Sequence, residues 1–279
     1  MNSMQIKDKI RNLAKNKNID FNTILRLYMY DKFIERLAIS RYRDNFILKG
    51  GFYLSIFFGI ESRSTMDIDT TIRNTSFSRK NIIHMIESII SIDIGDESLI
   101  EIISVSSIRD KDEYGGYRVT LSVQVENMKE KFQIDIATGD PITPSAVKYN
   151  YLTMLEHKNI HLWAYNIETI SAEKLETILS RVETTSRLRD YYDIYLIYTK
   201  DWNHVDKNVL KEAIKNTFTK REYKGNIEET IKVIKNSEIL KKRWDIYSKK
   251  YEYTNKISYQ EVIQCIEKVV LALETVDIS

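Results

Sequence analysis

The sequence predicts an α+β protein in which a sheet-containing N-terminal domain precedes a helical C-terminal domain. Residues 99–137 contain three segments with the apolar and polar alternation of strands, whereas the sequence after Trp163 carries almost only the apolar spacing of helices. The chain has 279 residues but only 8 Gly and 2 Pro, so few turns are forced and long helices are favoured. We therefore predict an α+β domain over 1–165 and a helical domain over 166–279.

The elements before the three strands are predicted in this order: a helix over 24–38, a turn at 50–51, a buried helix over 52–60, a strand over 66–72 and a helix over 82–90. Asp20 or Asn22 can cap the first of these helices, and Ser78 can cap the last. Strict alternation and β-branched residues mark the strand.

The three strands are predicted over 99–108, 117–126 and 131–137, where they form a meander. A polar turn at 111–116 joins the first two, and a short turn at Asn127-Met128 joins the last two. Pro141 and Pro144, the two prolines of the chain, end the regular run of the sheet. We place the crossover to the helical half there.

The helical half is predicted to begin at Ser171. Its helices are expected over 171–182, 188–199, 209–218, 227–235, 240–248 and 259–274.

Composition excludes several classes of protein. Cys265 is the only cysteine, so neither an internal disulfide nor a multi-cysteine zinc site can form. The net charge of +2 is too small for a chain-wide field that attracts polyanions, so any contact with nucleic acid depends on local patches. No apolar run reaches membrane-spanning length and the N-terminus is charged throughout. We expect a cytoplasmic protein without a membrane partner.

Two aspartates on the predicted strand 66–72 suggest a metal site. Asp67 and Asp69 lie two positions apart, so their carboxylates project to the same side of the sheet. Mutual repulsion makes the pair costly unless a cation neutralises it, and Mg²⁺ prefers such oxygen ligands. Asp135, on another strand, is a third carboxylate suited to a two-metal site that acts on phosphates. The alternative is that these aspartates pair with Arg63 or Arg73.

Candidate phosphate contacts occur in both halves of the chain. Gly50 and Gly51 open a helix whose backbone N–H groups can meet triphosphate oxygens, although a simple tight turn is the alternative. Lys174 and Arg181 lie on one face of the helix over 171–182, as a phosphate-binding stripe or as a solvated surface.

A second acidic group precedes a run of tyrosines. Asp190 and Asp193 stand beside Arg187 and Arg189, a combination that is unusual in a sequence this rich in aromatic residues. The tyrosines themselves more often serve packing than base stacking.

Four segments, in this order and spacing, resemble the motifs of the AbiEii/AbiGii family: LKGGFYLSIFFGIESRSTMDIDTTI, FQIDIATGDPITP, ISAEKLETILSR and RLRDYYDIY. These proteins are nucleotidyltransferase-like toxins of type IV toxin–antitoxin systems, which act in phage defence by abortive infection. The resemblance covers about residues 46–200. It implies a polymerase-β-like nucleotidyltransferase domain with a mixed sheet, followed by a helical domain that completes the active-site cleft.

The family also implies a chemistry and partners. The resemblance implies Mg²⁺-dependent use of a nucleoside triphosphate, GTP or CTP, an RNA acceptor, most naturally tRNA, and growth arrest reversed by a separately encoded antitoxin. It implies catalytic roles for Asp67, Asp69, Asp135, Lys174 and Asp190, with the metal on Asp67, Asp69 and Asp135. It implies nucleotide binding by Lys49, Gly50, Gly51, Arg181 and Asp193.

Two other functions stay open at the level of sequence. One is a nucleotide-binding interaction module that inhibits growth without catalysis, and the other is an antibiotic nucleotidyltransferase. We expect a monomer, while the base preference and direct contact with the antitoxin are open. Basic runs after residue 200 can contact RNA phosphates or simply face solvent.

Overall fold

The computed structural model describes residues 3–65, 67–108 and 115–274, and it divides into two compact units. Unit 1 comprises Met1–Gly139 and Val147–Ala164, and unit 2 comprises Asp140–Ala146 and Tyr165–Ser279. The chain therefore enters unit 2 briefly, returns to unit 1 and then leaves it for good. The sequence predicts one boundary after residue 165 and a crossover to the helical half at Pro141 and Pro144, but it does not show that the chain returns to unit 1 over Val147–Ala164.

Unit 1 contains one sheet and four helices among its described residues. The helices are α1 (Ser3–Lys17), α2 (Phe21–Ile39), α3 (Gly50–Phe58) and α4 (Arg79–Ile90). The strands are β1 (Phe46–Leu48), β2 (Asp67–Ile72), β3 (Ser98–Ile108), β4 (Gly116–Val125), β5 (Met128–Ala137), β6 (Val147–Leu152) and β7 (Asn159–Ala164). Their order in the sheet is β3-β4-β5-β2-β1-β7-β6.

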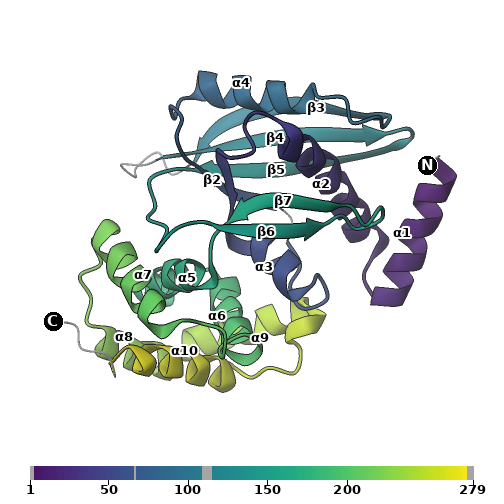
Figure 1. Cartoon of the computed structure of the whole chain (residues 1–279). Coiled ribbons are helices and arrows are strands. Elements are labelled where there is room, and N and C mark those ends of the chain that lie inside the picture. The colour runs from purple at the N-terminus through teal and green to yellow at the C-terminus, as the bar shows by residue number, and fades with distance from the viewer. Residues whose placement is uncertain (1–2, 66, 109–114, 275–279) are drawn as a thin grey trace. The chain divides into compact units, whose positions relative to one another are not determined.

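The sheet is mixed, as the family resemblance implies. Strand β2 runs parallel to β5, and β1 runs parallel to β7, whereas the other neighbouring strands are antiparallel. Helices α2 and α4 lie along one face of the sheet (Figure 1). There Tyr30 and Phe33 of α2 pack edge-on against Phe132 of β5, with ring centroids 4.7 and 6.5 Å apart.

Most predicted elements of unit 1 are confirmed. The meander is present as β3, β4 and β5, Asp20 caps α2 by accepting the Thr23 N–H, and Ser78 caps α4 in the same way through Asn81. Much of the predicted turn at 111–116, together with Met66, lies outside the described residues. Strands β1, β6 and β7 and helix α1 were not predicted.

In the described part of unit 2, every regular element is a helix. Its elements are α5 (Ile167–Arg181), the 3₁₀ turn η1 (Val182–Thr184), α6 (Leu188–Lys200), α7 (Lys207–Lys220), α8 (Ile227–Asn236), α9 (Glu238–Lys250), η2 (Glu252–Thr254) and α10 (Tyr259–Glu274). All six predicted helices are present, and α5 packs against α6 and α7. No helix in the described ranges is long and apolar enough to span a membrane.

One predicted helix start is wrong. Helix α5 begins at Ile167, where the Asn166 side chain accepts the Thr169 N–H, so Ser171 lies inside the helix. Its hydroxyl donates to the Ile167 carbonyl one turn earlier, which gives Ser171 a partner without a capping role.

Segment 140–146 is fastened to the helices of unit 2 by side-chain hydrogen bonds. Asn166 donates to the Thr143 carbonyl at 2.7 Å, and Asn216 donates to the Thr143 hydroxyl at 3.0 Å. Arg221, the residue after α7, pairs with Asp140 at 3.3 Å, while it also binds Glu176 at 2.8 Å. These contacts explain why this short segment belongs to unit 2.

Candidate active site

Pairing of β2 with β5 brings the three predicted aspartates of unit 1 onto one part of the sheet. Asp69 lies directly opposite Asp135, and Asp67 lies opposite Gln133. Directly opposed residues of neighbouring strands project to the same face, and Asp67 and Asp69 share a face because they are two apart. All three carboxylates are partly exposed. The predicted juxtaposition of Asp69 and Asp135 is therefore present in the backbone register.

The Gly50-Gly51 turn connects β1 to α3 beside Asp69. The Lys49 N–H donates to the Asp69 carbonyl at 3.0 Å, and the Gly51 N–H donates to Asp69 Oδ2 at 2.9 Å. The Asp69 carboxylate thus accepts from the first turn of α3, where the helix dipole favours negative charge. The Gly51 N–H, which we expect to meet a triphosphate, is therefore hydrogen-bonded to Asp69.

Both glycines are required, for different reasons. Gly50 has a φ of +60°, and a Cβ there would lie 2.6 Å from Asp69 Oδ2. A Cβ on Gly51 would lie 2.4 Å from an Nη of Arg63, whose side chain is buried beneath the turn. Lys49, which precedes them, is also buried. The turn therefore donates a hydrogen bond to Asp69 and packs against the buried Arg63 side chain.

Arg118 is a site residue that the sequence argument missed. It lies on β4 opposite Asp135, and its Nε and one Nη each donate to an Asp135 carboxylate oxygen at 2.7 Å. The hydrogen bond and charge of Asp135, with contributions from Asp67 and Asp69, raise the pKa of Arg118 although burial opposes this. All three aspartates therefore act on one guanidinium.

The residues present fit a magnesium ion in part. Asp67 and Asp69 supply carboxylate oxygens on one face, and Mg²⁺ is commonly held by one or two carboxylates together with substrate phosphates. Both oxygens of Asp135 are occupied by Arg118. Among the described residues, no group of three or more His, Cys, Asp or Glu side chains is arranged to hold a metal ion. The three-carboxylate ligand set stays a prediction.

The other predicted catalytic residues form a buried ion cluster in unit 2. Lys174 of α5 donates to Asp190 Oδ1 at 2.8 Å and contacts Asp193 Oδ2 at 2.6 Å. The Lys174 and Asp193 side chains are 9% and 0% exposed. The positive charge of Lys174 is therefore neutralised by carboxylates within unit 2. The second oxygen of Asp190 is buried without a hydrogen-bond partner in the described structure. Arg181, in contrast, is exposed at the end of α5.

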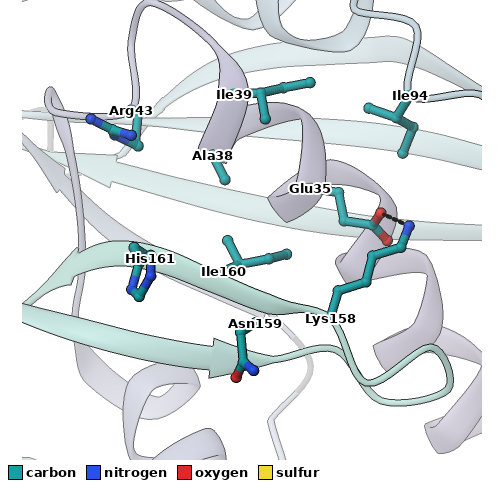
Figure 2. A pocket seen from close by; sticks show the side chains of 9 residues that line it. All are labelled: Glu35, Ala38, Ile39, Arg43, Ile94, Lys158, Asn159, Ile160 and His161. Atoms are coloured by element: carbon teal, nitrogen blue, oxygen red, sulfur yellow. Dashed lines mark hydrogen bonds and ion pairs between the residues drawn. The ribbon is translucent and has the colours of Figure 1, made fainter.

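A pocket elsewhere in unit 1 contains none of the predicted site residues. It has a volume of about 380 Å³ and lies where the end of α2 meets β7 and the loop before it (Figure 2). Figure 2 shows Lys158 reaching Glu35 across it, at 2.5 Å. Its lining consists of Glu35, Ala38, Ile39, Arg43, Ile94, Lys158, Asn159, Ile160 and His161.

Comparison with solved structures identifies the fold as that of nucleotidyltransferases. The nucleotidyltransferase toxin MenT4 from Mycobacterium tuberculosis H37Rv superimposes with a TM-score of 0.57 at 12% identity, covering 95% of this chain and 98% of that one. JHP933 from Helicobacter pylori superimposes with a TM-score of 0.52 at 15% identity, covering 91% and 94% of the two chains. No curated protein sequence matches the chain.

The sequence itself shows the family. A family model described as "Nucleotidyl transferase AbiEii toxin, Type IV TA system" matches residues 32–265. The match covers most of the chain, and this protein belongs to the AbiEii family. The resemblance inferred from the four motifs is confirmed, and the protein is a nucleotidyltransferase toxin of a type IV toxin–antitoxin system.

Proposed function

We propose that this toxin transfers a nucleotide from GTP or CTP to tRNA in a Mg²⁺-dependent reaction, and that the modified tRNA stops growth and phage propagation. A separately encoded antitoxin would reverse the arrest. The observation that best supports this is the pairing of Asp69 with Asp135 on parallel strands, with Asp67 on the same face and the Gly50-Gly51 turn at its edge.

In this reaction an acceptor hydroxyl oxygen bonds to the α-phosphorus of the triphosphate, and the bond from that phosphorus to pyrophosphate breaks. Asp67 and Asp69 would hold Mg²⁺, which supplies positive charge for the triphosphate oxygens. Asp135, once released from Arg118, would accept the proton of the attacking hydroxyl. The Gly51 N–H would then be available to a phosphate oxygen when Asp69 turns toward the metal.

The residues of unit 2 have a proposed electrostatic role. Lys174 would neutralise negative charge that gathers on the departing pyrophosphate, with Asp190 and Asp193 holding its ammonium in place. Arg181 and Lys49 would add positive charge for the triphosphate. A compact ammonium suits this role because it acts as a point charge.

Label transfer tests the proposal. The full-length protein is incubated with Mg²⁺, total tRNA and each α-labelled triphosphate in turn, and the RNA is separated on a gel. We expect label on tRNA from GTP or CTP, and at least about a hundredfold slower transfer by Asp69→Asn, which keeps the side chain's shape but removes its charge. Asp8→Asn, at an exposed position of α1, is the matched control and should transfer normally.

The other outcomes identify the rival functions. Tight triphosphate binding without label on any RNA would indicate an interaction module that inhibits growth without catalysis. Label on an aminoglycoside in place of RNA would indicate an antibiotic nucleotidyltransferase.

A further inference from the structure

Arg118 is the only charged side chain among residues 116–125, the span of β4. It lies opposite Asp135, which lies opposite Asp69, so three residues from three adjacent strands line up across one face of the sheet. The two hydrogen bonds of 2.7 Å to Asp135 use both oxygens of that carboxylate. This fork is the strongest geometry available to an arginine and a carboxylate.

Arg118 places a positive charge beside the three carboxylates. Three carboxylates on one face repel one another unless positive charge compensates them. A guanidinium stays charged at any physiological pH and is held here by Asp135 of the adjacent strand β5, while the charges of Asp67 and Asp69 act on it from β2, one strand further along the sheet. It therefore supplies, within the chain, positive charge that a divalent cation would otherwise supply.

We propose that Arg118 is an exchangeable counter-ion: it neutralises the aspartates while the site is empty and gives up Asp135 when a divalent cation enters with the nucleotide. The proposal rests on the proposed function, because it assumes that these aspartates bind metal. The Arg118 side chain is 38% exposed, so its guanidinium can turn toward solvent or a phosphate oxygen without a rearrangement of the core. Arg118 acts through Asp135 and is a positioning residue.

Two possible roles of Arg118, as a competitor of the metal ion and as a residue that only positions Asp135, predict opposite changes in metal affinity when Arg118 is removed. If Arg118 competes with the cation, its removal strengthens metal binding, because a positive charge leaves the site. If Arg118 only holds Asp135 in the correct rotamer for a metal, its removal weakens metal binding.

Titration with Mn²⁺, a cation that also accepts oxygen ligands, separates the two. Free Mn²⁺ is measured by electron paramagnetic resonance on the full-length protein without nucleotide. We expect Arg118→Met to bind Mn²⁺ at least about tenfold more tightly than the parent, and Arg118→Lys, which keeps the charge but loses the fork, to lie between them. Arg73→Met is the matched control, because Arg73 contacts the Asp44 carbonyl and the Trp163 ring instead, and it should bind like the parent.

Thermal unfolding supplies a second readout. In EDTA, Arg118→Met should melt below the parent because its carboxylates have lost their counter-ion, and Mn²⁺ should raise its melting temperature more than it raises that of the parent. Unchanged or weaker Mn²⁺ binding by folded Arg118→Met overturns the proposal, as does the absence of Mn²⁺ binding in every variant. Label transfer by the parent protein is measured separately, so the function can stand when the counter-ion proposal fails.

Discussion

Lys174 is predicted from the sequence to lie near a helix surface, but its side chain is buried in an ion cluster. From the sequence it lies at the edge of the apolar face of its helix, with its ammonium free to reach a triphosphate. In the structure that ammonium contacts two carboxylates, and one of them, Asp193, is fully buried. The partners come from α6, which begins after the end of α5, and helical spacing within one element cannot reveal them.

Lys174→Met should therefore destabilise the protein as well as inactivate it. Removal of the ammonium leaves Asp190 and Asp193 without their shared cation, and breaking a buried pair in this way costs about 3–5 kcal/mol of unfolding free energy. Urea unfolding of the purified variant measures the loss.

The exposed Lys215 of α7 provides the control, since Lys215→Met should stay within about 0.5 kcal/mol of the parent. Equal stability of Lys174→Met and Lys215→Met would show that the ion cluster contributes nothing. Transfer by Lys174→Met is best measured at a temperature where the variant is shown to be folded.

At the same scale, the sequence does not assign the register between β4 and β5, so it does not place Arg118 beside Asp135. The sequence predicts a turn at Asn127-Met128, but the hairpin closes with Val125 opposite Met128, and Glu126 takes a φ of +49°. An antiparallel register moves by two residues for each such shift of the turn. Only the observed turn places Arg118 opposite Asp135.

Among the elements, helices α2 to α10, strand β2 and the meander were predictable, whereas α1, β1, β6 and β7 were not. Strand β6 is an edge strand in which only Tyr151 is buried, so its sequence lacks clear alternation. Strand β1 has three residues, all buried, and is too short for any period to show. Strand β1 also pairs with β7, which is distant in sequence, whereas β3, β4 and β5 pair with strands next to them along the chain.

The junction between β1 and α3 yields a prediction about its first glycine. Gly50→Ala introduces a side chain at φ +60° and places its Cβ 2.6 Å from the Asp69 carboxylate, which must move. We expect a loss of about 1–3 kcal/mol in unfolding free energy, together with slower label transfer. Chemical denaturation and the transfer assay measure the two effects.

Gly95→Ala separates backbone strain from the contact with Asp69. Gly95 has a φ of +71°, and a Cβ there meets nothing within 4 Å. It should lose only the conformational part, about 1 kcal/mol, and transfer label normally. Equal losses of unfolding free energy and equal label transfer in Gly50→Ala and Gly95→Ala would show that the contact of Gly50 with Asp69 does not affect function.

For the whole molecule, the sequence indicated an α+β part and a helical part but not the way in which the chain divides between them. Composition shifts reveal where helices replace strands. They do not reveal that 140–146 binds the helical unit before the chain returns to the sheet, since those contacts depend on Asn166, Asn216 and Arg221, all later in the chain. The predicted site residues follow the same rule, because the sequence marks them as candidates but does not show that Arg118 binds Asp135 or that Asp193 binds Lys174.

Global stability should depend on pH through Asp31. This carboxyl is buried in α2, where it accepts from the Tyr151 hydroxyl and the Met154 N–H, and burial raises its pKa from 3.8 to about 7 while Glu35 adds to the rise and Lys32 opposes it. The folded protein thus binds more protons than the unfolded chain between these values, so stability falls as pH rises from about 4 to about 7.

Asp31→Asn should flatten that part of the profile, by an amount on the order of a few kcal/mol between pH 4 and 7. An asparagine can accept from the Met154 N–H and donate to the Tyr151 hydroxyl, so the fold is retained. Unfolding free energies across this range measure the slope, with Asp8→Asn as the exposed control. A slope unchanged in Asp31→Asn would assign the pH dependence to other groups.

The position of β1 in the sheet has a consequence for how the toxin is made. Ile47 pairs with Thr71 on one side and with Trp163 on the other, so β1 lacks one of its two neighbours until β7 has been translated. A transcript cut or stopped before codon 159 encodes Asp67, Asp69 and Asp135 on strands of an unfinished sheet and lacks α5 to α10. We expect such truncated products, when expressed in the cell, to leave its growth rate unchanged, so that toxicity requires translation through α5 to α10.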